Sequence, residues 1–163
     1  MPTATEQLQV VELAREFARE KIEPHAAEWD RTKHFAREVI DELGRLGFLG
    51  MTTPEEYDGM GLDTLTYLLA LEEIAAADAS IAVSMSIHNA IPTTMLVKHG
   101  TPAQRERGLK PMARVCLLAG FALSEAEAGS DAASLAAQAV RRGDEWFLTG
   151  SKAWATNAGT AAV

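Results

Sequence analysis

The sequence predicts an α+β fold, in which an all-helical lobe precedes the first strands of an antiparallel β domain. Up to residue 113, apolar residues recur every three or four positions, as they do on one face of a helix. After that point a continuous apolar run, and then an alternation of apolar and polar residues, replace this spacing. We therefore expect a helical domain over residues 1–113 and the beginning of a β domain over residues 114–163. About four strands are expected, which is few to close a barrel or a sandwich.

Helical spacing predicts five helices in the first domain. They cover residues 5–29, 37–47, 64–79, 81–99 and 101–112. Residues at their ends and bends support these assignments.

Thr5 is the expected N-cap of the first helix, and Pro24 is expected to bend that helix or to make it restart. Gly47 is the expected left-handed cap of the second helix. Pro92 lies inside the fourth helix, where we expect a kink or a local shift of hydrogen bonding. Thr101 is the expected N-cap of the last helix, with a proline at the first helical position.

Strand patterns begin with the continuous apolar run at 115–123, which predicts a buried strand. Alternation over 137–141 and 145–150 predicts an antiparallel pair, joined by a turn at 142–144. A further strand, which carries a tryptophan, is expected over 150–157.

Composition excludes several functional classes. The net charge of −8 comes from 15 basic and 23 acidic residues without a basic stripe, so nucleic-acid binding is not expected. One cysteine forms no internal disulfide, and the four histidines lack the spacing of metal ligands. No run approaches the roughly 18 apolar residues of a membrane span, and no apolar targeting segment opens the chain. We therefore expect a cytoplasmic protein.

The most distinctive sequence of the chain lies in two segments of the β domain. Residues 121–131 read Phe-Ala-Leu-Ser-Glu-Ala-Glu-Ala-Gly-Ser-Asp, and residues 150–157 read Gly-Ser-Lys-Ala-Trp-Ala-Thr-Asn. Together they resemble the flavin-binding signature of the acyl-CoA dehydrogenase family, F/Y-A-L-T-E-P-x-A-G-S-D followed by G-x-K-x-W-I-T-N. Ala126 stands where the family usually has Pro, and Ala155 where it more often has Ile. Shorter similar stretches in the first domain extend the resemblance over nearly the whole chain.

A flavin requires donors at its pyrimidine edge, a polar contact at N5 and a flat apolar wall. Ser124 is expected at the pyrimidine edge, Thr156 near N5 and Trp154 against the ring. The resemblance places further flavin contacts at Phe121, Leu123 and Ala155, and it places Ser130 beside both the flavin and the acyl-CoA thioester. The alternative is that Phe121, Leu123 and Trp154 are ordinary core residues.

The helix at 81–99 carries a ridge of Val83, Ile87 and Ile91 at four-residue spacing. The resemblance makes this ridge, together with His88, a candidate wall for the acyl tail, and ordinary helix packing is the alternative. The acidic residues of 125–131 lie too close in sequence to form a catalytic carboxylate pair across a cleft. We expect Glu125 to hold this loop in place instead.

The resemblance implies FAD-dependent α,β-dehydrogenation of an acyl-CoA thioester to the trans-2-enoyl-CoA. The β domain is then the truncated start of the family's middle domain, and the C-terminal helical domain, with its catalytic Glu, lies outside the 163 residues. We assign no catalytic base within the chain. An electron-transfer flavoprotein is the implied electron acceptor, and a homodimer or homotetramer the implied assembly. The alternatives are an acyl-CoA oxidase-like flavoenzyme and a non-catalytic helical interaction module.

Overall fold

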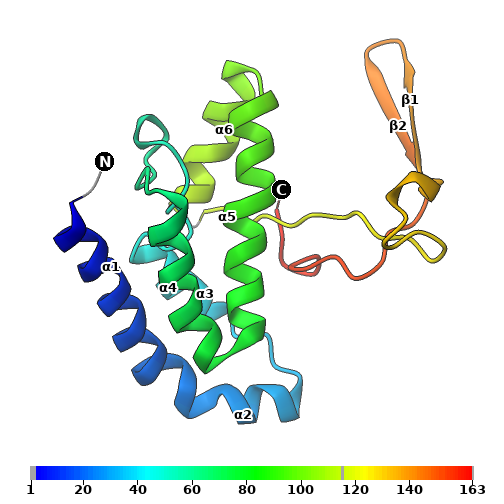
Figure 1. The fold of residues 1–163 in the computed structure, drawn as a ribbon. Coiled ribbons are helices and arrows are strands. Elements are labelled where there is room, and N and C mark those ends of the chain that lie inside the picture. Colours follow the sequence, from blue (N-terminus) through cyan, green and yellow to red (C-terminus); the bar gives the residue numbers. More distant parts are fainter. Residues whose placement is uncertain (1–2, 115, 163) are drawn as a thin grey trace.

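The computed structural model describes residues 3–114 and 116–162, and it confirms the α+β prediction. Figure 1 shows a helical lobe on one side and a β-hairpin that projects from it on the other. Two extended segments join the hairpin to the lobe. The helices are α1 (Ala4–Phe17), α2 (Glu23–Thr32), α3 (Arg37–Arg45), α4 (Thr64–Ala77), α5 (Ala79–His99) and α6 (Pro102–Ala113).

The N-cap of the first helix lies two residues before the predicted one. Thr3, not Thr5, is the N-cap, because Glu6 lies three residues after it and the two complete a capping box. The Glu6 amide donates to the Thr3 hydroxyl at 3.3 Å, and the Glu6 carboxylate accepts from the Thr3 amide at 2.6 Å. The predicted bend is confirmed as a π-helical turn, Ala18–Ile22, directly before α2, whose second residue is Pro24. A proline has no N–H for the regular helical ladder, and the wider turn accommodates that gap.

Helix α5 runs through Pro92 as one element, with the expected local change in hydrogen bonding. Pro92 offers no N–H to the carbonyl of His88, four residues earlier. The hydroxyl of Thr93 donates to that carbonyl instead, at 2.9 Å. The proline therefore remains inside the helix without leaving this buried carbonyl unpaired.

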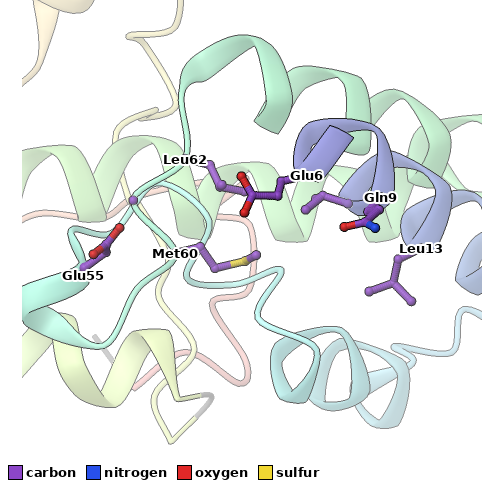
Figure 2. A pocket seen from close by; sticks show the side chains of 8 residues that line it. Glu6, Gln9, Leu13, Glu55, Met60 and Leu62 are labelled. Carbon is purple, nitrogen blue, oxygen red and sulfur yellow. The ribbon is translucent and has the colours of Figure 1, made fainter. Parts of the chain in front are cut away.

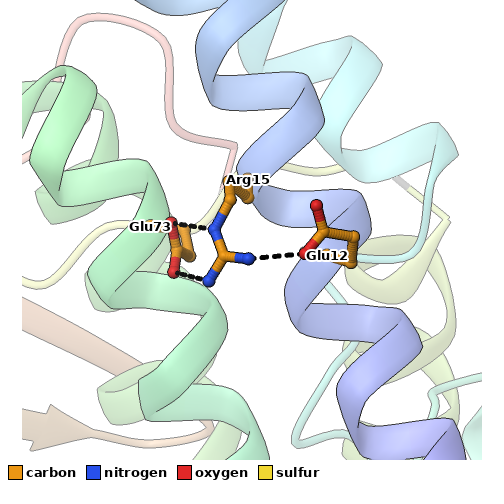
Figure 3. A network of polar contacts seen from close by, with 3 residues as sticks. All are labelled: Glu12, Arg15 and Glu73. Atoms are coloured by element: carbon orange, nitrogen blue, oxygen red, sulfur yellow. Dashed lines mark hydrogen bonds and ion pairs between the residues drawn. The ribbon is translucent and has the colours of Figure 1, made fainter.

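One apolar core joins α1, α3, α4, α5 and the loop that follows α3. Its fully buried side chains include Leu43 of α3 and Ile74 of α4. A surface ion pair adds a link between α1 and α4, since the Arg15 guanidinium contacts both carboxylate oxygens of Glu73, at 2.7 and 3.1 Å (Figure 3). Leu118, after the last helix, also lies in this core. The lobe therefore holds the start of the second domain by apolar burial.

The predicted hairpin is confirmed as β1 (Gln138–Arg142) and β2 (Glu145–Thr149), which pair antiparallel. Gly143, at φ +64°, supplies the left-handed conformation of the two-residue turn. These are the two strands that form the sheet within the described residues, fewer than the sequence suggested. Every residue of both strands is exposed.

Two predicted strands are absent from the described residues. Residues 116–123, of the run predicted to be a strand, are irregular, and residue 115 lies outside the described part. No described strand pairs with this run. Its backbone forms isolated hydrogen bonds instead, some to side chains and some to single backbone amides. Residues 150–157 are also irregular, because Gly150, Trp154 and Asn157 have positive φ angles, which interrupt a strand.

Candidate functional site

The structure brings together the two segments that carry the distinctive sequence. The carbonyl of Ser124 accepts a hydrogen bond from the amide of Ala153 at 2.8 Å. Further along, the carbonyl of Leu118 accepts from the amide of Ala162, also at 2.8 Å. Hydrogen bonds therefore link the two segments at Ser124 and their flanking residues at Leu118, along the path between the helical lobe and the hairpin (Figure 1).

Gly120 sets how closely the two segments approach. A Cβ atom at this position would lie 2.8 Å from the carbonyl oxygen of Thr156 and 3.3 Å from the Cβ of Ala161. The first distance is too short for a carbon beside a backbone oxygen, so any larger residue must push the segments apart. The glycine therefore determines the distance between residues predicted to contact one ligand.

Three apolar side chains of these segments are exposed or partly exposed to solvent. Trp154 is 94% exposed and Leu123 is 39% exposed, while Phe121 is half-buried. Trp154 is therefore not part of the core that the described residues form. Its φ of +58° is unusual for an aromatic residue.

Polar groups with free hydrogen-bonding capacity accompany this apolar surface. The hydroxyls of Ser124 and Thr156 make no hydrogen bond to any residue that the structure describes, although both residues are half-buried. Ala155, between Trp154 and Thr156, is half-buried, and Ser130 is exposed on the acidic loop. Exposed apolar side chains and unpaired hydroxyls on the same two segments are the kinds of group that a flavin requires.

Glu125 has the structural role expected of it. Its carboxylate accepts from the amides of Ala136 and Ala137, at 2.7 and 3.0 Å, and from Lys152 Nζ at 2.7 Å. Lys152, followed by these amides, lowers the pKa of Glu125 to about 2. Lys152 also donates to the carbonyl of Leu123 at 3.0 Å, so one ion pair joins both segments and the start of the hairpin.

The predicted acyl-tail wall divides into two parts. Val83 is 49% exposed, and Ile87 and Ile91 are half-buried, so this ridge lies at the surface of α5. His88 is fully buried and does not share that surface, and its inclusion in the wall is wrong. Its Nδ1 accepts a hydrogen bond from the amide of Ala119 at 3.0 Å. Burial lowers the pKa of His88 to about 4, against the opposing effect of carbonyls of Met112 and Leu49.

Asn157 ends the second segment, and the sequence analysis assigned it no role. It is buried with φ +66°, and its side-chain amide donates to the carbonyls of Ala119 and Ser84, at 3.0 and 3.3 Å. Asparagine is one of the few residues that adopt this backbone conformation readily. That preference is the signal in the sequence that could have identified Asn157.

Other features lie apart from these segments. A groove of about 560 Å³ separates α1 from the loop before α4, and its lining combines Glu6 and Glu55 with Leu13, Met60 and Leu62 (Figure 2). Within residues 3–114 and 116–162, no group of three or more His, Cys, Asp or Glu side chains is arranged to hold a metal ion. No helix of the described chain is long and apolar enough to cross a membrane.

Comparison with known proteins matches the chain in two parts. The family model for the N-terminal domain of acyl-CoA dehydrogenase matches residues 4–115, and the model for its middle domain matches residues 120–163. A probable acyl-CoA dehydrogenase of Bacillus subtilis, YngJ, is 39% identical over 94% of this chain and 40% of its own length. The mouse mitochondrial short-chain specific acyl-CoA dehydrogenase is 41% identical over 88% of this chain and 35% of its own.

Solved structures give the same result. Butyryl-CoA dehydrogenase from Megasphaera elsdenii superimposes with a TM-score of 0.92 at 34% identity, over 99% of this chain and 43% of its own. A chain from a study of the electron transferring flavoprotein of Acidaminococcus fermentans gives a TM-score of 0.93 at 35% identity, over 99% of this chain and 42% of its own. This chain thus spans less than half the length of the relatives that it matches. Through its helical lobe and its two linked signature segments alike, the chain belongs to the acyl-CoA dehydrogenase family.

Proposed function

We propose that this chain contributes the helical domain and part of the flavin site to an enzyme that dehydrogenates acyl-CoA thioesters to trans-2-enoyl-CoA. The pairing of the two signature segments, with exposed Trp154 beside unpaired hydroxyls, is the observation that carries the proposal. The residues present suit FAD, because they combine apolar surface with free donors. When bound, FAD supplies the acceptor for the β-hydrogen of the substrate.

Each side chain then has a role that its surroundings allow. The Ser124 hydroxyl donates to the pyrimidine edge and Thr156 donates near N5, because neither is occupied by a described residue. Trp154, Phe121 and Leu123 cover the ring and exclude water, which strengthens the polar contacts. Ala155 lies at the same surface through its backbone.

The substrate is assigned to two nearby surfaces. Ser130, exposed on the acidic loop, is proposed to face the thioester end. The ridge of Val83, Ile87 and Ile91 is proposed to contact the acyl chain, since an apolar helix face at the surface suits an alkyl group. His88 is not part of this wall.

No residue of this chain is proposed as the base that removes the α-proton. Glu125 is held ionised by Lys152 and two amides, and its lowered pKa makes it a weak base. The base is proposed to be a Glu of a C-terminal helical domain. An electron-transfer flavoprotein is the proposed electron acceptor, a homodimer or homotetramer the proposed assembly, and the cytoplasm the proposed location.

The experiment is a titration of the purified protein with FAD, followed by flavin fluorescence, in matched variants. Ser124→Ala is expected to weaken FAD binding about tenfold, because it removes one half-buried donor. Ser124→Thr keeps the hydroxyl and is expected to bind like the parent. Wild-type protein that does not bind FAD would refute the proposal and favour an interaction module. Hydrogen peroxide formation in air, with acyl-CoA present, would identify an oxidase instead.

A further inference from the structure

The peptide group of Ala119 is held on both sides by buried side chains. Its N–H donates to His88 Nδ1 at 3.0 Å, and its carbonyl accepts from Asn157 Nδ2 at 3.0 Å. Ala119, His88 and Asn157 are all buried, so water does not compete for these bonds. Asn157 also donates to the carbonyl of Ser84 in α5, at 3.3 Å.

These contacts join three parts of the chain that are distant in sequence. His88 and Ser84 belong to α5, Ala119 to the segment before the signature, and Asn157 to its end. We call His88, Ala119 and Asn157 the Ala119 latch. It attaches both signature segments to helix α5.

The latch lies directly beside residues proposed to contact flavin. Ala119 precedes Phe121 by two positions, and Asn157 directly follows Thr156. Short backbone links transmit a shift at either latch residue to these side chains. A displacement of about 1 Å at a binding or reacting group is enough to lower the reaction rate many-fold.

We propose that His88 and Asn157 are positioning residues, which act through the Ala119 peptide to hold the two flavin-contacting segments in register on α5. This inference rests on the proposed flavin site and extends it to two buried residues that touch neither flavin nor substrate. His88 serves in its neutral form, because only an unprotonated Nδ1 accepts from an amide.

Substitutions at His88 and Asn157 test the contribution of each residue separately. The His88→Asn variant offers a carbonyl oxygen near the position of Nδ1 and preserves an acceptor for the Ala119 amide, whereas His88→Leu fills the space without one. Asn157→Gly keeps the positive φ and removes both donors. Ile74→Val, in the core between α4 and its neighbours, lowers stability without touching the latch.

The test measures FAD affinity and thermal unfolding of the purified protein in these variants, with amide exchange of residues 116–123 in the flavin-free form. His88→Leu and Asn157→Gly are each expected to raise the FAD dissociation constant about tenfold and to speed exchange at Ala119. His88→Asn and Ile74→Val are expected to stay within about twofold of the parent in FAD affinity. The double variant is expected to lose less than the product of the two single losses, since both bonds hold one peptide group.

Three outcomes would overturn the inference. If His88→Leu and Asn157→Gly lower the melting temperature but leave FAD affinity unchanged, the latch is purely structural and the proposed function stands. If Ile74→Val weakens FAD binding as much as they do, general stability explains the effect. If the wild-type protein binds no FAD, the proposed function fails and the positioning role fails with it. Should His88→Leu not fold, Asn157→Gly and His88→Asn decide the question alone.

Discussion

The helical lobe and the region after it are held together by different forces. In the lobe, amphipathic helices share one continuous apolar core, whose side chains are almost fully buried. In residues 116–162, both strands are exposed, and hydrogen bonds and one ion pair connect the segments. Apolar burial tolerates small shifts, whereas hydrogen bonds depend on position. The lobe thus provides stability, and the second region depends on the lobe for its geometry.

The largest expected difference between the two regions comes from truncating one leucine in each. Leu43→Ala, at a fully buried position of α3, is expected to lower the free energy of unfolding by about 3 kcal/mol through lost burial and a residual cavity. Leu148→Ala, at an 80% exposed position of β2, is expected to change it by less than about 0.5 kcal/mol. Urea unfolding followed by circular dichroism measures both. Equal effects would show that the hairpin shares the core.

The connection between the two regions is expected to weaken in mild acid. His88 has a folded pKa of about 4, below its ordinary value of 6.5, so the unfolded chain binds its proton first. The contribution of neutral His88 is therefore fully present above pH 6.5, and about 3 kcal/mol of stability is lost as the pH falls from 6.5 to 4. Unfolding free energies across this range measure the effect. His88→Asn, which does not titrate there, is expected to remove this part of the pH dependence of the unfolding free energy. An unchanged pH dependence would assign the effect to other groups.

The close approach at Gly120 offers a smaller test within the second region. Gly120→Ala is expected to cost about 2 kcal/mol, because its Cβ meets the Thr156 carbonyl at 2.8 Å. Gly129→Ala is the control, since a Cβ there has nothing within 4 Å. Thermal unfolding of both variants provides the measurement. A neutral Gly120→Ala would mean that the segments lie further apart than described.

The smallest expected effect lies at the start of the lobe. Thr3→Ala removes the N-cap of α1 and is expected to cost about 1 kcal/mol. Thr5→Ala replaces a residue inside the helix with a better helix former and is expected to leave stability unchanged or slightly higher. Comparison of the two melting temperatures tests the cap assignment. The opposite order would restore Thr5 as the cap.

The same contrast explains what could be predicted from the sequence. Helix α4 and the hairpin turn at Gly143 follow from local spacing and turn chemistry, and both were predicted close to their observed positions. The strands expected at 115–123 and 150–157 were wrong in the described residues, because a strand needs a partner that local sequence does not specify. His88 was included in the candidate acyl-tail wall because spacing alone does not reveal a bond to Ala119, which lies 31 residues away. The signature segments were found by resemblance, and their pairing emerged from the fold.

The most direct test of the central claim is an anaerobic titration with butyryl-CoA of the FAD-loaded enzyme that contains this chain together with the proposed catalytic Glu, followed by flavin absorbance. Dehydrogenation predicts that the oxidised flavin band bleaches as substrate is added and that a 2-enoyl-CoA product forms in equal amount. Bound flavin that stays oxidised under a range of acyl-CoA chain lengths would contradict the account.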